Sequence, residues 1–312
     1  MEAAGVIFER PGSVAVRRLA LTAPGPADVV VETLASGVST GTEKLLFTGT
    51  MPAFPGLTYP LVPGYESVGR IVEAGESSGR TVGSLVFVAG AACYTEAAGL
   101  FGATASRLVV PGARTVEIDE TLGEEAVLLA LAATAHHAVS RAGGPVDLVV
   151  GHGVLGRLIS RMLPALGRPD PIVWEINPDR RRGADGYAVI DPADDTRTGL
   201  AGVIDASGDT GLIDRIVPRL SRPGEIVLAG FYGERIDFRF TPAFMRELRL
   251  SIAAEFTPAD VTAVLALIAA GRLSLSGLIT HRAAPAAAQS AYRTAFEDAD
   301  CLKMVIDWRT AA

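Results

Sequence analysis

Six consecutive residues have the composition and spacing of a turn that binds a dinucleotide. They are Gly151, His152, Gly153, Val154, Leu155 and Gly156. The apolar run Asp147–Val150 precedes them, and a helical pattern over Val154–Leu166 follows. In such a turn the first glycine permits a tight bend, the second lets the backbone approach a pyrophosphate, and the third allows close helix–strand packing. The helix N-terminus would offer N–H groups and a positive dipole to the phosphates. The pattern predicts a dinucleotide site; a glycine-rich turn without a ligand is the competing interpretation.

An acidic residue stands where the adenosine ribose would lie. Glu175 follows the last glycine of the turn by 19 residues and ends the next strand-like run. A carboxylate there can accept hydrogen bonds from ribose hydroxyls and would repel a 2′-phosphate, so the sequence favours NAD over NADP. Arg180, Arg181 and Arg182 follow closely in the chain and keep NADP open, although they could equally form a solvated helix face.

Two further strand-like runs end in small and polar residues. The first ends in Asp205, Ala206 and Ser207, and another ends in Gly230 and Phe231. Ligands of open parallel sheets bind at the carboxyl ends of the strands, so we expect these residues to contact the nicotinamide ribose and ring. Ordinary glycine turns would give the same pattern.

The elements that position these residues alternate regularly. Strand-like runs cover Asp147–Val150, Ile172–Glu175, Ala188–Asp191, Val203–Ala206, Glu225–Gly230 and Leu250–Ala254. Helical patterns cover Glu124–Arg141, Val154–Leu166, Thr210–Leu220 and Pro258–Ala270. Six strands interleaved with helices predict an α/β fold with a doubly wound parallel sheet.

The first 120 residues differ from this region. Short β-type runs cover Val29–Thr33, Val68–Val72, Leu85–Val88 and Ser106–Val110, separated by Gly and Pro turns. The segment 47–63 has four prolines, which forbid a helix or central strand there. A last strand-like run, Cys301–Trp308, follows a helical stretch and is expected to return to the first domain. The predicted domains are therefore 1–122 with 281–312, and 123–280.

Composition narrows the function classes. The 312 residues carry a formal net charge of −7, which argues against a nucleic-acid binder with a broad basic face. Two cysteines, Cys93 and Cys301, cannot form a disulfide framework or a four-cysteine zinc site. The N-terminus lacks a secretion signal, and the longest apolar stretch is too short to span a membrane. We expect a cytoplasmic protein, with loose association with a membrane surface left open.

Together these features resemble the medium-chain dehydrogenase/reductase superfamily. The segments Gly37–Glu43 and Gly64–Gly69 are similar to its first-domain motifs. The resemblance covers the whole chain and implies a GroES-like β-rich catalytic domain joined to a Rossmann NAD-binding domain. Zinc-dependent members carry a cysteine in the first motif and a histidine where Tyr65 stands, and they have a four-cysteine lobe. This chain has none of these, so no metal is expected.

The resemblance is closest to the branch of the superfamily that serves bacteriochlorophyll biosynthesis. It is carried by the segments Ser39–Leu46, Met51–Gly56, Tyr59–Gly69, Gly99–Pro111 and Leu128–His136. It implies NAD-dependent, zinc-independent oxidation of the 3-(1-hydroxyethyl) group of bacteriochlorophyllide a to 3-acetyl, with this tetrapyrrole as substrate. A zinc-free quinone or enoyl reductase that uses NADPH is one alternative. A non-catalytic scaffold that binds nucleotide or pigment is the other.

Without zinc, a side chain must accept the proton of the alcohol. Tyr65 and Glu66 are the candidates, with Ser39, Thr40 and Lys44 as a relay or as groups that orient the hydroxyl. Tyr65 could instead be a packed tyrosine of the barrel, and Glu66 could support the adjacent turn. Lys44 could pair with Glu43 on the surface or contact a propionate of the substrate.

Several aromatic residues could line a wide apolar pocket for a flat macrocycle. The candidate substrate residues are Phe47, Phe54, Tyr59, Phe101 and His136. Ordinary loop packing is the competing interpretation for the aromatic side chains, and a packed histidine is the competing interpretation for His136 and its neighbour His137. A homodimer is expected from the superfamily, with no interface residue indicated by the sequence.

Overall fold

The computed structural model describes residues 1–233 and 235–310, which form two compact units. Unit 1 contains residues 1–130 and the chain from Ser276 onward, and unit 2 contains Leu131–Leu275. Residues 123–130 and 276–280, which the sequence pattern assigns to the second domain, lie with unit 1. The 3₁₀ segment η2 (Glu120–Leu128) packs against strands β3, β5 and β6 of unit 1, and Ser276 Oγ donates to Glu125 in that segment.

Unit 1 is built from two sheets. One has the strand order β2-β1-β4-β7, and the other has the order β16-β17-β3-β5-β6-β9, with β8 also paired to β3. The strands are β1 (Glu2–Arg10), β2 (Ser13–Ala20), β3 (Asp28–Val38), β4 (Leu61–Val62), β5 (Ser67–Ala74), β6 (Leu85–Val88), β7 (Ala98–Gly99), β8 (Arg107–Pro111), β9 (Thr115–Glu117), β16 (His281–Ala283) and β17 (Met304–Asp307). The sequence pattern predicts β3, β5, β6 and β8 but misses the hairpin of β1 and β2.

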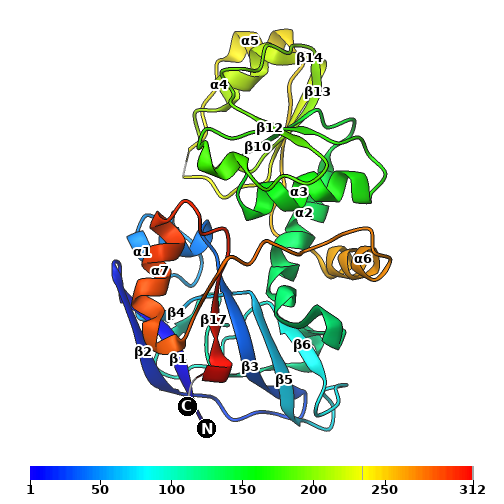
Figure 1. The fold of residues 1–312 in the computed structure, drawn as a ribbon. Helices are drawn as coiled ribbons and strands as arrows, with labels where there is room; N and C mark the ends of the chain where they lie inside the picture. Colours follow the sequence, from blue (N-terminus) through cyan, green and yellow to red (C-terminus); the bar gives the residue numbers. More distant parts are fainter. Residues whose placement is uncertain (234, 311–312) are drawn as a thin grey trace. The chain divides into compact units, whose positions relative to one another are not determined.

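The C-terminal strand β17 returns to unit 1, the first domain of the chain, as predicted. β17 pairs antiparallel with β3, so that Met304 lies opposite Val38. Figure 1 shows the red β17 beside the blue β3. Helix α7 (Ala288–Glu297) packs on β17 and β2 and buries Tyr292 in the core. The end of the chain therefore contributes directly to the core of unit 1.

A short helix that the sequence pattern does not predict follows β3. Helix α1 (Thr42–Thr48) ends at Gly49, whose φ of 71° lies in the left-handed region that glycine adopts without strain. Its inward face buries Leu46 and Glu43. The helix therefore turns the predicted Ser39–Leu46 motif into a compact support for the end of β3.

Unit 2 is a doubly wound sheet with six parallel strands, as predicted. The strand order is β12-β11-β10-β13-β14-β15, which is the dinucleotide-binding order 3-2-1-4-5-6. The strands are β10 (Leu148–Val150), β11 (Ile172–Trp174), β12 (Ala188–Ile190), β13 (Leu200–Asp205), β14 (Leu220–Leu228) and β15 (Arg249–Ile252). The helices are α2 (Leu129–Arg141), which begins in unit 1, and α3 (Val154–Ala165), α4 (Ile213–Ile216), α5 (Phe240–Met245) and α6 (Pro258–Ala269).

One helix prediction in unit 2 is wrong in extent. Thr210–Leu220 contains only the four-residue α4 and a 3₁₀ turn over Val217–Arg219. Pro218 lies at the start of that turn, and because it has no N–H it cannot continue an α-helical ladder.

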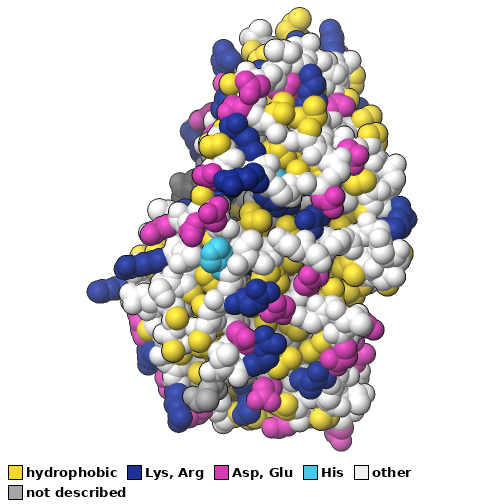
Figure 2. All heavy atoms as spheres, in the orientation of Figure 1, with side chains coloured by type: hydrophobic (Ala, Val, Ile, Leu, Met, Phe, Trp, Pro, Cys, Tyr) yellow, Lys and Arg dark blue, Asp and Glu magenta, His cyan; other side chains and the backbone are white. Residues whose placement is uncertain are grey.

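The surface carries charges of both signs. In the face shown in Figure 2, Lys and Arg side chains alternate with Asp and Glu side chains, and no broad basic area is visible there. Within residues 1–233 and 235–310, no helix has the length and apolar character needed to cross a bilayer.

Candidate active site

The glycine turn of unit 2 has the geometry that the sequence predicts. Gly151 has a φ of 93°, and a Cβ atom on Gly156 would lie 1.8 Å from the carbonyl oxygen of Gly151. Only glycine fits at position 156, because α3 begins directly against the end of β10. A Cβ atom on Gly153, the residue before α3, would meet nothing within 4 Å. Position 153 therefore leaves open space beside the first turn of α3, which Val154 and Leu155 begin.

His152 forms hydrogen bonds that connect the glycine turn to the loop that contains Arg180 and Tyr187. Its Nδ1 lies 2.6 Å from the carbonyl oxygen of Arg180, and its Nε2 lies 2.8 Å from the Tyr187 hydroxyl. Since a carbonyl only accepts, Nδ1 carries the proton and Nε2 accepts from Tyr187. Burial lowers the pKa of His152 to about 4, so the ring is neutral. The role of His152 could not be predicted from the sequence, because a histidine inside a glycine fingerprint carries no signal of its own.

Arg157 anchors the same loop from α3. Its guanidinium donates to the carbonyl oxygens of His152, Arg180, Arg182 and Gly183 at 2.6–3.1 Å. A buried guanidinium needs such acceptors, since leaving its donors unpaired would be costly. The segment from Arg180 to Gly183 is therefore fixed by hydrogen bonds from Arg157 to its main-chain carbonyl groups.

Glu175 lies at the end of β11, where the ribose site is expected. Its carboxylate accepts from the backbone N–H of His152 at 3.0 Å and of Asn177 at 2.8 Å, and the residue is 8% exposed. Of the neighbouring arginines, Arg181 is paired with Asp191 and donates to the Glu175 carbonyl, and Arg182 is paired with Asp179. The carboxylate is thus fixed in place while these two guanidinium groups point to other carboxylates.

The other predicted cofactor residues meet beside this turn. Ala206 N–H donates to the Val150 carbonyl at 2.9 Å, which joins the ends of β13 and β10. A Cβ atom on Gly151 would lie 3.2 Å from the main chain of Ser207. Asp205 is buried and accepts from Ser207 N–H at 2.8 Å.

The end of β14 joins the same group. A Cβ atom on Gly230 would lie 3.2 Å from the N atom of Gly208. Phe231 follows it and is 42% exposed. The carboxyl ends of β10, β13 and β14 therefore form one edge that small residues keep open.

In unit 1, Tyr65 and Ser39 form a hydroxyl pair. The Tyr65 hydroxyl lies 2.6 Å from Ser39 Oγ and 3.5 Å from Thr42 Oγ1. The Phe101 ring packs edge-on against Tyr65 with 5.1 Å between the centroids. Burial, with the nearby Glu66 charge, raises the pKa of Tyr65 well above its usual range. A phenol in this state keeps its proton, so Tyr65 is suited to hydrogen bonding and not to action as a phenolate base.

Glu66 points into the core and meets a residue that the sequence analysis misses. Lys303, the residue before β17, places Nζ 2.6 Å from Glu66 Oε2 and 3.2 Å from the Val38 carbonyl oxygen. Both side chains are almost fully buried. Burial raises the pKa of Glu66 and the Lys303 ammonium opposes that rise. Gly37 leaves room for this pair, since a Cβ atom there would lie 2.2 Å from Glu66 Oε2.

Glu43 is a second buried carboxyl. It accepts from the Ser39 backbone N–H at 2.9 Å and from the Tyr292 hydroxyl at 2.8 Å. The proposed surface pair of Glu43 with Lys44 is wrong, because Glu43 faces inward and Lys44 Nζ donates to the Phe296 carbonyl at 3.0 Å. Lys44 and Thr40 are both exposed, next to the hydroxyl pair in sequence but outside this network.

The predicted aromatic residues gather on one apolar cluster of unit 1. Phe47, Phe54, Tyr59 and Phe101 are all partly buried against it. Phe54 and Phe101 have ring centroids 6.1 Å apart, and Tyr59 donates to the Leu46 carbonyl. Phe47 packs at 5.5 Å from Phe296, deeper in the cluster. Phe101 thus contacts both Tyr65 and Phe54, whereas Phe47 and Tyr59 contact the α1–α7 side.

His136, on α2, lies in a different environment. Its Nδ1 is 2.7 Å from Asp260 Oδ1, and Nδ1 of His137 is 3.1 Å from Asp260 Oδ2. Asp260 also forms a reciprocal capping box with Thr257 at the start of α6. Burial raises the pKa of Asp260, but the bonds from Thr257 and the two histidines outweigh burial and lower the pKa to about 2. Both histidines therefore help to fix α6 on α2.

The donor set of unit 1 does not resemble a zinc site. Across the part of the chain that the structure describes, no three His, Cys, Asp or Glu side chains are placed to hold a metal ion. Cys93 and Cys301 are both buried, and neither forms a disulfide. A catalytic zinc takes three protein ligands and an open position, which these residues do not provide.

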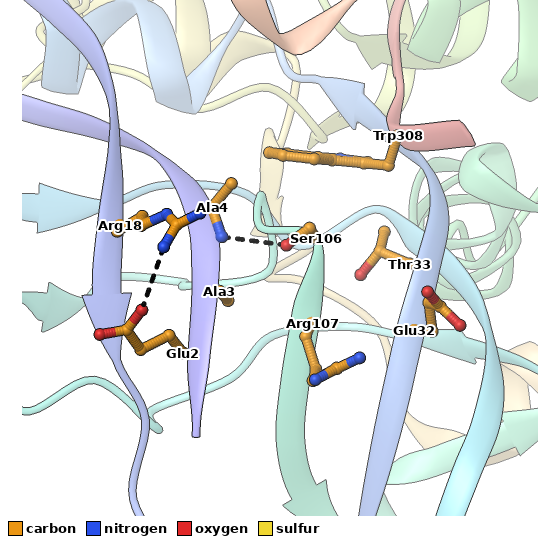
Figure 3. Close-up of a pocket in the computed structure, with 9 residues that line it drawn as sticks. All are labelled: Glu2, Ala3, Ala4, Arg18, Glu32, Thr33, Ser106, Arg107 and Trp308. Atoms are coloured by element: carbon orange, nitrogen blue, oxygen red, sulfur yellow. Dashed lines mark hydrogen bonds and ion pairs between the residues drawn. The ribbon is translucent and has the colours of Figure 1, made fainter. Parts of the chain in front are cut away.

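A separate polar cavity lies between β1, β2, β3 and β8 of unit 1. Its volume is about 400 Å³, and Figure 3 shows the Trp308 ring covering one side and Arg107 extending from β8. Glu2 and Arg18 form an ion pair of 3.8 Å at its mouth, and Ser106 Oγ accepts from the Ala4 N–H. None of the predicted site residues lines this cavity, so it is not part of the candidate active site.

Comparison with known proteins agrees with this arrangement. Residues 25–120 match the family model of the alcohol dehydrogenase GroES-like domain. Two proteins named 2-desacetyl-2-hydroxyethyl bacteriochlorophyllide A dehydrogenase, from Rhodobacter capsulatus and Cereibacter sphaeroides, are 53% and 52% identical to this chain. Each alignment covers 100% of both proteins.

Solved structures show the same fold at low sequence identity. The 2R,3R-butanediol dehydrogenase of Bacillus subtilis has a TM-score of 0.84 at 19% identity, over 98% of this chain and 99% of that one. An alcohol dehydrogenase of Escherichia coli CFT073 complexed with NADH has a TM-score of 0.83 at 22% identity, with the same coverage. The predicted superfamily and fold class are confirmed. The chain belongs to the medium-chain dehydrogenase/reductase superfamily and, within it, to the family of the bacteriochlorophyllide dehydrogenases.

Proposed function

We propose that this protein oxidises the hydroxyethyl group of a bacteriochlorophyllide to an acetyl group, with NAD⁺ as the hydride acceptor. The full-length identity of 53% with the Rhodobacter capsulatus dehydrogenase carries this proposal. The glycine turn at the switch point of a 3-2-1-4-5-6 sheet supports a nicotinamide dinucleotide as the cofactor.

The reaction removes a hydride and a proton from a secondary alcohol. The carbinol carbon loses the hydride, the hydroxyl oxygen loses the proton, and a C=O double bond forms. NAD⁺, when bound, accepts the two electrons and the hydrogen of the hydride. The carbinol carbon is attached to a conjugated macrocycle, which stabilises the developing carbonyl. The tasks left to the side chains are to orient the hydroxyl and to take its proton.

For these tasks we propose the hydroxyl pair of Tyr65 and Ser39. The 2.6 Å bond between them fixes both oxygens, and either can accept from one partner while donating to the other. Two such groups can pass the proton toward the half-buried Thr42 and on to solvent water, the final acceptor, so that neither hydroxyl becomes a stable anion. Glu66 has one oxygen bound by Lys303, so its proposed part is to support the turn that carries Tyr65. Thr40 and Lys44 stay proposed contacts at the exposed edge of the same motif.

The charges around Glu175 support NAD over NADP. The carboxylate is held by two backbone N–H groups, each of which occupies one of its oxygens and leaves lone pairs for ribose hydroxyls. A 2′-phosphate would face this negative charge, while Arg181 and Arg182 are paired with Asp191 and Asp179. Replacement of Glu175 by Gln should therefore reduce the preference for NAD by about tenfold, as loss of one charge-dependent contact.

The proposed reaction is tested with purified protein, a hydroxyethyl bacteriochlorophyllide, and either NAD⁺ or NADP⁺. We expect the long-wavelength absorption band of the pigment to shift with NAD⁺, together with the appearance of NADH. Pigment that binds tightly without any band shift on protein that binds NADH would overturn the enzymatic proposal in favour of a scaffold. Reduction of a quinone with NADPH, without pigment oxidation, would place the chain among the reductases.

We propose a second copy of this chain as the partner of the sheet edge of unit 2. β15 ends the sheet and, within the described chain, pairs only with β14. Leu250 and Ile252 on this strand, and Phe240, Phe244 and Met245 on α5, are exposed. Figure 2 shows hydrophobic side chains at the surface over the region of α5. An apolar edge strand is a template for a further strand, and a two-fold axis lets the same strand satisfy it in each copy.

This homodimer is tested by light scattering on the wild type and on Ile252→Lys. We expect the wild type to have twice the chain mass and Ile252→Lys to dissociate into monomers. Val16 is an exposed apolar residue of unit 1, so the control variant Val16→Lys should remain a dimer. A monomeric wild type would overturn the proposal. Binding of the monomer to anionic lipid vesicles, lost in Ile252→Lys, would instead assign the patch to a membrane surface.

A further inference from the structure

Unit 1 contains a buried group of charges that the proposed reaction does not use directly. It consists of Glu43, Glu66 and Lys303, and each of the three side chains is at most 1% exposed. They come from α1, from the turn before β5, and from the residue before β17. Two carboxyl groups and one ammonium group therefore lie together in the interior of unit 1.

The geometry distinguishes the two carboxyl groups. Glu66 is in direct contact with Lys303 at 2.6 Å, so its negative charge is neutralised there. Glu43 meets only neutral donors, which are the Ser39 N–H at 2.9 Å and the Tyr292 hydroxyl at 2.8 Å. An unpaired buried charge is costly, and such a group is neutralised by a proton instead.

The titratable groups around Glu43 act in both directions. Burial raises the pKa of Glu43 to about 8, and the Glu66 charge adds to this rise. The Ser39 N–H, the Tyr292 hydroxyl and the Lys303 ammonium oppose it. Tyr65 also senses the charge of Glu43. Glu43, which has no ammonium partner, is therefore the carboxyl that holds a proton near neutral pH, and in that state its O–H at Oε2 donates to the Tyr292 hydroxyl oxygen.

We propose that Glu43 is a positioning residue that works as a neutral carboxylic acid. It holds the main chain of Ser39, and through it the Ser39–Tyr65 hydroxyl pair that we assign to the substrate hydroxyl. A negative charge on Glu43 would attract the protons of the hydroxyl pair. It would also favour departure of the substrate proton toward the pair more than a neutral acid does. The charge state of Glu43 therefore alters how the pair holds its protons. This role rests on the proposed function, whereas the protonation of Glu43 does not.

The protonation is tested on the folded protein without any substrate. Infrared difference spectra between pH 6 and pH 9.5 should show a neutral-carboxyl band that disappears near pH 8, and this band should be absent in Glu43→Gln. In Tyr292→Phe the band should persist to higher pH, because a donor that lowers the pKa of Glu43 is lost. A spectrum of Glu43→Gln identical to that of the wild type would overturn the proposal.

The positioning role is tested by pigment oxidation at pH 7 in two variants. Glu43→Ala loses both hydrogen bonds, and we expect the rate to fall about tenfold. Glu43→Gln keeps an acceptor for Ser39 and a polar contact for Tyr292, so it should recover most of that loss and show no inflection near pH 8. Equal rates for the Ala and Gln variants would overturn the positioning role. If the wild type does not oxidise pigment, the proposed reaction fails, and the infrared result still decides the state of Glu43.

Discussion

The two units build their candidate sites from different materials. In unit 2 the backbone makes the site: Gly151, Gly153 and Gly156 lie within six residues, and what matters at each is the absence of a side chain. In unit 1 side chains make the site: Ser39, Glu43, Glu66, Tyr292 and Lys303 come from distant parts of the sequence and meet inside a core. A local backbone site is visible as a motif, whereas a buried charge network is visible only after the chain has folded.

The largest expected effect on function is the loss of cofactor binding when the backbone site is broken. In Gly156→Ala the new Cβ atom would lie 1.8 Å from the Gly151 carbonyl oxygen, so the turn must move. We expect unfolding of unit 2 at lower temperature and loss of NADH binding, with a destabilisation of about 1–3 kcal/mol or more. Calorimetry and NADH fluorescence titration measure the two effects.

Gly153→Ala is the matched control for this variant. Its Cβ atom meets nothing within 4 Å, so the melting temperature should hold. NADH affinity should still fall, because the open space at position 153 is where the phosphates are expected. Equal loss of stability in both variants would contradict the assignment of close packing to Gly156 alone.

The next effect concerns the charge network of unit 1. Lys303→Met leaves the Glu66 carboxylate buried without its cation, and loss of one partner of a buried pair costs about 3–5 kcal/mol. The double variant Lys303→Met with Glu66→Gln removes both charges and should regain a large part of this loss in thermal unfolding. A double variant as unstable as the single one would show that the pair acts through shape and not through charge.

These two sites also mark how far the sequence can be interpreted. The six strands of unit 2, the glycine turn and Glu175 could be predicted, since each depends on neighbours in the chain. Lys303 and Tyr292 could not be predicted, because a lone lysine or tyrosine near the C-terminus gives no sign that β17 and α7 bring it to Glu66 or Glu43. Glu43 next to Lys44 even suggests a solvated pair, and only the formation of α1 turns its side chain inward.

The units should also respond to pH in opposite directions. His152 in unit 2 has its pKa lowered from 6.5 to about 4 by burial, so its stabilisation is complete above pH 6.5 and is lost as the pH falls through 4. Glu43 in unit 1 has its pKa raised from 4.5 to about 8, so its stabilisation is complete below pH 4.5 and is lost as the pH rises through 8.

His152→Gln is the variant that checks the acid side of this contrast. Between pH 6.5 and pH 4 its free energy of unfolding should fall less than that of the wild type, by on the order of 2–3 kcal/mol. Glu43→Gln should leave the acid response of unit 2 unchanged. Denaturant unfolding at a series of pH values, followed by the fluorescence of Trp174 in the core of unit 2, reports the difference. An unchanged acid response in His152→Gln would assign the titration to another group.

The smallest effect is expected at Lys44, which is exposed and lies outside the charge network. Its ammonium donates only to the Phe296 carbonyl and is exposed, so Lys44→Met should change the free energy of unfolding by less than about 0.5 kcal/mol. If Lys44 contacts a propionate of the pigment, the KM for the free acid should rise several-fold, while the KM for a methyl-ester pigment should not change. If Lys44→Met leaves the KM of the free acid and the KM of the methyl ester unchanged, Lys44 does not contact the propionate. Its role is then limited to its bond with the Phe296 carbonyl of α7. Substrate recognition would then lie with the aromatic side chains around Tyr65, and the contrast between a charged core and an uncharged binding surface in unit 1 would become sharper.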